Sequence, residues 1–198
     1  MSGEELHQLG HEGARRAKEW LEATTRVDAH WVNPDHFAKK KLTFEWSKGR
    51  GSFSYDLGGV LRGGEFHQQE FLAEVKYYSQ AGDQPDLYQE YLAKCYRAFD
   101  TRPDRCDNFM WVTWHPFSVS KWASLCSAEE VHRAVIKHRD RALGVPDQYE
   151  AESAFCIDTA EDVAARLWLI VLCERQENLV ISPEHRAVVR SHDIKEKK

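Results

Sequence analysis

The ten residues from Asn108 to Phe117, NFMWVTWHPF, carry apolar side chains at both odd and even positions. Because side chains alternate between the two faces of a sheet, a strand of this kind buries both of its faces. Helices packed on each face provide that burial in α/β proteins. The segment therefore predicts a central strand in a three-layer α/β sandwich, with a mixed central sheet flanked by helices.

Apolar residues at helical spacing predict the helices of the outer layers. In the first of them, Gly10 and Gly13 would allow close approach to the sheet. The segment LWLIVLC at 167–173 lies inside the last of them and is also compatible with a strand, because periodicity alone does not decide for so short a run. The helices are expected over about residues 4–24, 85–101, 129–143 and 159–176. Short edge strands are expected at 179–182 and 187–190.

From Leu42 to Ser79 the pattern changes to a period of two, which is typical of strands. SFSYDLGGVL at 52–61 is expected to form one strand and FLAEVKYYS at 71–79 the next. The glycines between these two segments supply a turn. The two strands are therefore expected to be antiparallel neighbours.

A chain of 198 residues is compatible with one domain, 1–198. Its five cysteines, an odd number without a CxxC pair, indicate neither a disulfide framework nor a zinc ribbon. The net charge of −5 gives no general attraction for polyanions, so nucleic-acid binding would need a local basic patch. The longest apolar run is far too short to span a bilayer, and no signal-peptide pattern is present, so we expect a soluble, cytoplasmic protein without membrane contact.

Two charged residues, Glu74 and Lys76, lie two positions apart inside the second of these strands. Alternation places both side chains on one face of the strand, opposite an apolar face. Asp56 lies on the polar face of the preceding strand. Pairing of the two strands can therefore bring two carboxylates and one ammonium group into a single cluster.

The chemistry of this trio is specific. Two carboxylates are hard oxygen ligands for Mg²⁺, which normally takes one or two of them together with waters and phosphate oxygens. A metal in such a site can polarise a phosphodiester and lower the pKa of a bound water. Lys76 could orient that water or stabilise the charge of the transition state.

Asp56, followed after a hairpin-length gap by Glu74-Val75-Lys76, resembles the D…(D/E)xK motif of the PD-(D/E)XK nuclease superfamily, also called restriction-endonuclease-like. The first predicted helix, LGHEGARRAKEWL, is similar to the opening helix of many members, in which a glutamate in a Gly-x-Glu context contributes to the metal site. Glu12 stands at that position here. The resemblance implies a restriction-endonuclease-like core.

The resemblance covers about residues 4–117 and leaves about 118–190 as a helical C-terminal extension. Tyr55 stands where the family motif has a nominal proline. Some members carry a Gln-x-x-x-Tyr pair in the helix after the motif, whereas here Gln89 is followed four residues later by Ala93. This difference argues against close kinship with the exonuclease-like branch of the family.

The function implied by the resemblance is a Mg²⁺- or Mn²⁺-dependent nuclease that hydrolyses phosphodiester bonds, with DNA favoured over RNA. Asp56, Glu74 and Glu12 would be catalytic carboxylates and metal ligands, and the backbone carbonyl of Val75 a further ligand. Lys76 would position the attacking water. Related small members serve restriction, repair or bacteriophage defence, and many act as homodimers or beside a helicase or sensor protein.

A basic segment in the later helix could grip a phosphate backbone, although a solvated helix face explains it equally well. An inactive nuclease-like subunit that only binds nucleic acid or serves as a scaffold is the alternative function. It predicts nucleic-acid affinity that EDTA does not change, and no turnover. The candidate nucleic-acid contacts are Arg133, Lys137, Arg139, Arg141 and Lys40.

Overall fold

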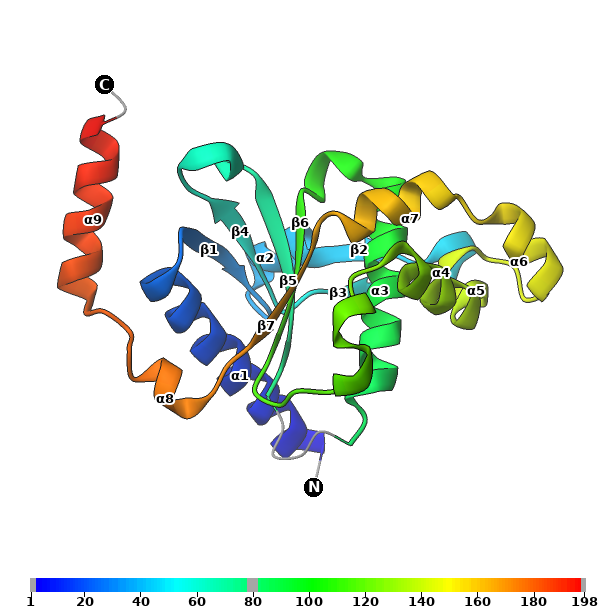
Figure 1. Cartoon of the computed structure of the whole chain (residues 1–198), viewed down its shortest axis with the longest axis horizontal. Helices are drawn as coiled ribbons and strands as arrows, with labels where there is room; N and C mark the ends of the chain where they lie inside the picture. Colours follow the sequence, from blue (N-terminus) through cyan, green and yellow to red (C-terminus); the bar gives the residue numbers. More distant parts are fainter. Residues whose placement is uncertain (1–2, 78–81, 197–198) are drawn as a thin grey trace.

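The computed structural model describes residues 3–77 and 82–196. They form an α/β fold in which helices flank both faces of a five-stranded mixed sheet (Figure 1). The strand order is β1-β4-β5-β6-β7, antiparallel from β1 to β5 and parallel from β5 to β7. The strands are β1 (Val27–Val32), β4 (Leu57–Leu61), β5 (Glu70–Lys76), β6 (Asn108–Thr113) and β7 (Leu167–Val171).

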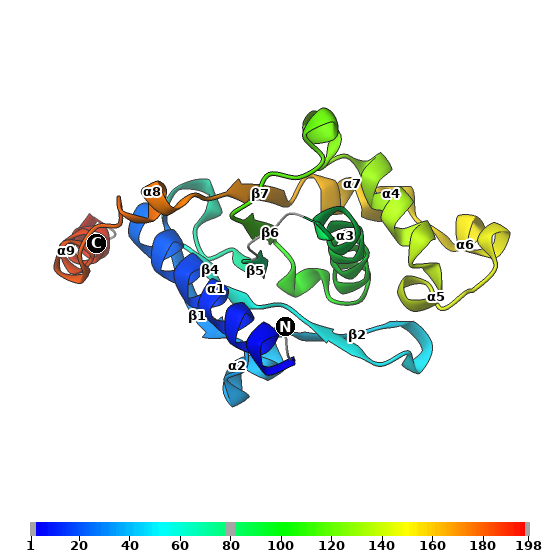
Figure 2. The same cartoon turned by 90° about the horizontal axis from the view of Figure 1, so that it is seen from below.

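Helix α1 covers one face of this sheet, and α3, α4 and α7 cover the other (Figure 2). Each face has its own apolar core cluster, so the sheet is buried from both sides. The α-helices are α1 (Gly3–Thr24), α2 (His36–Leu42), α3 (Gln84–Thr101), α4 (Ala128–Lys137), α5 (Arg139–Ala142), α6 (Gln148–Ala154), α7 (Ile157–Ala164), α8 (Glu174–Glu177) and α9 (Pro183–Glu196). The 3₁₀-helices span Ser47–Gly49, Gly64–Phe66, Pro103–Arg105 and Val119–Ser124.

A second, two-stranded sheet lies beside α3. It pairs β2 (Thr43–Glu45) with β3 (Ser52–Ser54) in antiparallel register. The Phe44 and Phe53 rings stack with centroids 5.9 Å apart, and Phe44 meets the Tyr55 ring edge-on. These aromatic side chains belong to the same core cluster as the buried side of α3, so the small sheet extends that core.

The prediction of an α/β fold with a mixed central sheet is confirmed. Strand β6 lies between β5 and β7, and each of its six residues is buried. The expected antiparallel pairing of β4 and β5 is also confirmed, with Leu57 opposite Ala73. The expected strand at 71–79 begins one residue earlier than predicted, and its last two positions lie outside the described residues.

The two glycines of α1 differ in their surroundings. A Cβ on Gly13 would lie 2.5 Å from the Cβ of Tyr77, so this position requires glycine for close approach to the sheet. A Cβ on Gly10 would have no atom within 4 Å. The prediction of close approach is therefore confirmed at Gly13 and wrong at Gly10.

The prediction of one continuous strand over 52–61 is wrong. Strand β3 pairs with β2, and β4 pairs with β1 and β5 in the other sheet. The chain changes sheets at Tyr55 and Asp56, where the Tyr55 N–H donates to the Leu42 carbonyl and the Asp56 N–H donates to the Ala73 carbonyl. Period-two alternation continues through this junction, so the pattern alone gives no sign of the break.

The prediction of one helix over 159–176 is also wrong, and its strand alternative at 167–173 is confirmed. Helix α7 ends at Ala164, and β7 then pairs in parallel with β6. Tertiary pairing with a buried strand thus decides the structure of this ambiguous apolar run. The sheet therefore includes a strand from the expected helical extension at 118–190.

The edge strands expected at 179–182 and 187–190 are absent from the described chain, which has no regular element at 179–182 and forms α9 at 187–190. Pro183 is the first helical residue, and the Ser182 hydroxyl accepts a hydrogen bond from the His185 N–H at 3.3 Å. A serine N-cap followed by proline is a helix-start signal.

The helix expected at 129–143 is broken at His138 into α4 and α5. No helix in the described part of the chain is both long enough and apolar enough to cross a bilayer.

Candidate active site

Strand β5 presents Glu74 and Lys76 on the face of the sheet that α3 covers. Leu72, on the same face, belongs to the α3-side core cluster. The alternate residues Phe71 and Val75 belong to the cluster beneath α1. The alternation expected from the sequence therefore places both charged side chains as predicted.

Asp56 is held beside this pair by the junction between β3 and β4. Its carbonyl accepts the Asn33 N–H at 3.0 Å, and its N–H donates to Ala73 at 2.9 Å. Its side-chain Oδ2 accepts the Val75 N–H at 2.8 Å. The structure therefore brings Asp56 next to the Glu74-Val75-Lys76 segment, and both ends of its backbone unit are fixed.

Two lysines contact the same oxygen of Glu74. The Nζ of Lys76 lies 2.8 Å from Glu74 Oε1, and the Nζ of Lys94 lies 3.3 Å from it. The Glu74 side chain is only 7% exposed, and its Oε2 is buried without a hydrogen-bond partner among the described residues. A buried carboxylate oxygen without a partner leaves one coordination position open for another group.

Lys94 was not anticipated from the sequence. It lies on α3, on the helical stripe shared by Leu87, Tyr91 and Ala98. Its side chain is 14% exposed, and its ammonium group reaches the strand below. A lysine inside an otherwise apolar stripe was the available signal, because burial of a lysine needs a compensating partner.

The two carboxylates differ in their electrostatics. Burial raises the pKa of Asp56 to about 6, and the negative charge of Glu74 adds to this effect, against the smaller opposing effects of Lys76 and the Val75 N–H. Burial also raises the pKa of Glu74, but the charges of Lys76 and Lys94 outweigh it, so that this pKa is lowered overall. The site therefore holds a Glu74 carboxyl group with a lowered pKa beside an Asp56 carboxyl group whose pKa is raised to about 6.

These residues fit a divalent cation of the Mg²⁺ type. The buried Oε2 of Glu74 lacks a partner, and a positive charge would relieve the unfavourable ionisation of Asp56. Within residues 3–77 and 82–196 there is no group of three or more His, Cys, Asp or Glu side chains that could hold a metal ion. Two carboxylates suit Mg²⁺, which completes its shell with water and phosphate oxygens.

Glu12 does not join this pair. Its carboxylate pairs with Arg15 one turn further along α1, at 2.7 Å, and its side chain is 43% exposed. The hydrogen bond from Arg15 lowers the pKa of Glu12. The Glu12 carboxylate thus has a positive partner on its own helix, Arg15, in place of the predicted metal ion.

The predicted nucleic-acid contacts are largely occupied by partners within the protein. Arg133 pairs with Glu130, Lys137 with Asp86, and Arg141 with Glu90. Arg139 donates to the backbone carbonyls of Pro146 and Ile136. Lys40 is exposed on the short helix α2. Most of the basic side chains of α4 and α5 predicted as nucleic-acid contacts therefore have partners within the protein.

Asp56→Asn is expected to raise the free energy of unfolding by about 2–3 kcal/mol at pH 8. Because the pKa of Asp56 is about 6 in the folded state and near 4 when unfolded, its ionisation opposes folding increasingly from pH 4 to pH 6 and by a constant amount above that. Asparagine keeps an acceptor for the Val75 N–H but carries no charge. Urea unfolding at pH 4, 6 and 8 should therefore show a gain at pH 8 that vanishes at pH 4.

The matched control is Asp107→Asn. The Asp107 carboxylate also accepts a backbone N–H, that of Glu70 at the other end of β5. It should show no gain at pH 8, since it does not face Glu74. An equal gain in both variants, or a gain in Asp56→Asn that persists at pH 4, would contradict the assigned cause.

Asp56, Glu74, Lys76 and Lys94 together form a cluster that we call the carboxylate–lysine site. The two carboxylates can hold a divalent cation, and the lysines can stabilise an anion or orient a water beside it. Comparison of the chain with protein-family models, with curated proteins and with solved structures gave no match.

Proposed function

We propose that this protein is a Mg²⁺- or Mn²⁺-dependent nuclease with a restriction-endonuclease-like core, and that DNA is its preferred substrate. The observation that carries the proposal is the carboxylate–lysine site itself. It combines a buried carboxylate with an open oxygen, a second carboxylate with a raised pKa, and two lysines within 3.3 Å of Glu74. Groups that are strongly perturbed in this way cluster at functional sites.

The order of elements also supports the proposal. The resemblance implies helix, strand, hairpin strand, helix and strand, and the chain contains α1, β4, β5, α3 and β6 in that order, with β1, α2, β2 and β3 between α1 and β4. Asp56 precedes the first strand of the hairpin, and Glu74 and Lys76 lie at the end of the second. The resemblance further favours a role in restriction, repair or bacteriophage defence, as a homodimer or with a helicase or sensor protein.

Within this proposal each residue of the site has its own role. Asp56 and Glu74 would hold the cation, which when bound polarises a phosphodiester and acidifies a coordinated water. Asp56 is oriented for this role by the Val75 N–H. Lys76 would orient the attacking water and stabilise the negative charge that develops on the phosphate. Lys94 would hold Glu74 ionised and in place.

The second candidate is an inactive subunit that only binds nucleic acid. The specific observation in its favour is that Lys76 and Lys94 already compensate the charge of Glu74 without a metal. This reading predicts no turnover and an affinity for nucleic acid that does not change with EDTA.

The purified protein is expected to nick or degrade supercoiled plasmid in Mg²⁺ or Mn²⁺ and to stop when EDTA is added. Glu74→Gln should lower the cleavage rate by at least about 10²-fold, because it removes one of the two charged groups that hold the metal. Glu70→Gln is the matched control on the same strand, and its rate should stay near that of the wild type.

Cleavage that resists EDTA, or that survives in Glu74→Gln, would exclude the proposed chemistry at this site. A folded wild-type protein that binds DNA equally well with and without EDTA, and does not cleave it, would establish the second candidate instead.

A further inference from the structure

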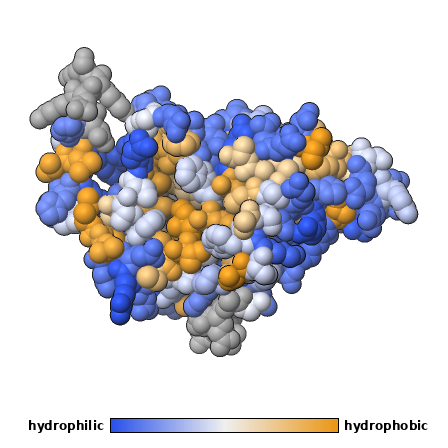
Figure 3. Space-filling view, viewed as in Figure 1, coloured by the Kyte–Doolittle hydropathy of each residue, from blue (hydrophilic) through white to orange (hydrophobic). Residues whose placement is uncertain are grey.

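An apolar slot opens on the α1 side of the sheet, between the end of α1 and strand β7. Its volume is about 320 Å³, within the range of small-molecule sites. Figure 3, in the view of Figure 1, shows apolar side chains gathered around the place where β7 lies. The apolar side chains that line the slot include those of Leu21, Leu61, Phe66, Met110, Trp168 and Ile170.

An oriented aromatic ring forms one wall of this slot. Trp168 is 38% exposed, and its indole Nε1–H donates to Asn108 Oδ1 at 3.0 Å. The Phe66 ring meets it edge-on, with centroids 5.4 Å apart. Since these two contacts fix the ring in place, a flat ligand could stack on it at little entropic cost.

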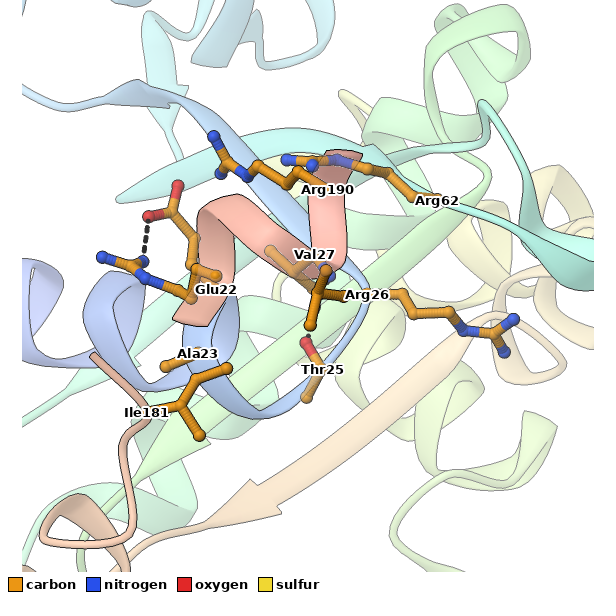
Figure 4. Close-up of a pocket in the computed structure, with 10 residues that line it drawn as sticks. Glu22, Ala23, Thr25, Arg26, Val27, Arg62, Ile181 and Arg190 are labelled. Carbon is orange, nitrogen blue, oxygen red and sulfur yellow. Dashed lines mark hydrogen bonds and ion pairs between the residues drawn. The ribbon is translucent and has the colours of Figure 1, made fainter. Parts of the chain in front are cut away.

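Arginines line the rim of the slot. Arg26 and Arg62 belong both to the slot and to a smaller neighbouring pocket of about 80 Å³, to which α9 contributes Arg186 and Arg190 (Figure 4). In Figure 4, Arg26 extends away from Arg62 and Arg190, so its guanidinium group lies apart from theirs. The two pockets are therefore neighbours that share Arg26 and Arg62 in their linings.

Carboxylates only partly compensate these cations. Arg62 and Arg190 share Asp28, and Arg186 pairs with Glu22. Arg26 forms no ion pair within the described residues, and a Cβ on Gly64 would approach its Nη1 to 2.5 Å. Three of the four arginines therefore share two carboxylates, and Arg26 carries a positive charge that no carboxylate of the described residues pairs with.

We propose that this slot binds a nucleotide, with the base stacked on Trp168 and the phosphate held by Arg26, the arginine of the rim that forms no ion pair within the described residues. A purely apolar ligand would leave the arginines unused, and inorganic phosphate would leave the aromatic wall unused. A base joined to a phosphate uses both, through stacking and charge-assisted hydrogen bonds.

This nucleotide site is separate from the carboxylate–lysine site. Asp56 precedes the first residue of β4, whereas Arg62 follows its last residue, so the two sites lie at opposite ends of that strand. They also lie on opposite faces of the sheet. Nucleotide binding here therefore does not depend on the proposed nuclease activity.

Isothermal titration of the full chain with ATP in EDTA buffer tests this site, since EDTA removes any metal-dependent binding elsewhere. Saturable binding is expected, and Trp168→Ala and Arg26→Gln should each weaken it by about tenfold. Trp168→Phe keeps a ring for stacking and should retain most of the affinity. Arg50→Gln, which alters an arginine that pairs with Asp140 far along the chain, should leave it unchanged.

Two further probes distinguish the source of the nucleotide and can overturn the proposal. Binding of a 5′-phosphorylated oligonucleotide that is stronger than that of ATP, with the same loss in both variants, would identify a strand end as the ligand. Inorganic pyrophosphate that binds as tightly as ATP, with no effect of Trp168→Ala, would overturn the proposal. Absence of binding by all three probes to the folded wild type would do the same.

Discussion

Lys76→Ala is expected to lower the rate of metal-dependent plasmid cleavage by about 10²–10³-fold. The ammonium group of Lys76 lies 2.8 Å from Glu74 Oε1, and its side chain is 13% exposed. At this position it can reach both the carboxylate and a water at the rim of the site, and alanine removes the charge that stabilises the developing anion. Initial rates of nicking at saturating Mg²⁺, measured beside the wild type, give the magnitude directly.

Lys94→Ala is the matched variant, because Lys94 contacts the same oxygen from the other side at 3.3 Å. We expect a loss of about tenfold or less, since Lys76 still compensates Glu74. Lys41→Ala removes a lysine of α2 that pairs with Glu70, which lies on β5 like Glu74. This variant should leave the cleavage rate unchanged. Undiminished cleavage by Lys76→Ala would contradict the proposed role, and equal losses in Lys76→Ala and Lys94→Ala would mean that both lysines act only by holding Glu74.

The core of the site could be predicted because it depends on local geometry. Strand alternation fixes which side chains share a face, so Glu74 and Lys76 had to lie together once β5 was recognised. Antiparallel pairing with the preceding strand then brings Asp56 within reach. Neither step requires knowledge of how the helices pack.

The remaining parts of the site depend on packing that the sequence does not encode locally. Lys94 reaches Glu74 only because α3 lies across β5 with one particular rotation about its own axis. Glu12 could contact either a metal ion or Arg15. Arg15 lies three residues away on the same helix and forms an ion pair without any tertiary contact. The nucleotide site joins α1, β7 and α9, which are far apart in the sequence, so no motif could have indicated it.

The errors in the fold have a similar cause. The apolar run at 167–173 has no decisive periodicity, and pairing with β6 makes it a strand. The junction between β3 and β4 interrupts neither the alternation nor the apolar pattern, although the chain changes sheets there. Helix α9, in contrast, was signalled by Ser182 and Pro183, and β propensity was given too much weight against that start signal.

Gly59→Ala is expected to lower the free energy of unfolding by about 3 kcal/mol. This is near the upper end of the range for insertion of one methyl group into a packed site. A Cβ at this position would lie 2.0 Å from the carbonyl oxygen of Asp28 and 2.9 Å from the Cα of Ala29. Both are backbone atoms of β1, so no side-chain rotation can relieve the clash and the two strands must separate. Urea unfolding at pH 7 measures the loss.

Gly10→Ala is the control, because a Cβ there would meet nothing within 4 Å on the exposed side of α1. It should raise the free energy of unfolding by about 0.5–1 kcal/mol through helix propensity alone.

Separation of β1 from β4 in Gly59→Ala would also disturb the hydrogen bond from the Asn33 N–H to the Asp56 carbonyl, which holds one of the two carboxylates in place. Gly59→Ala is therefore expected to lose cleavage at temperatures where it is still folded, and wild-type stability in this variant would show that β1 and β4 are not packed as closely as described.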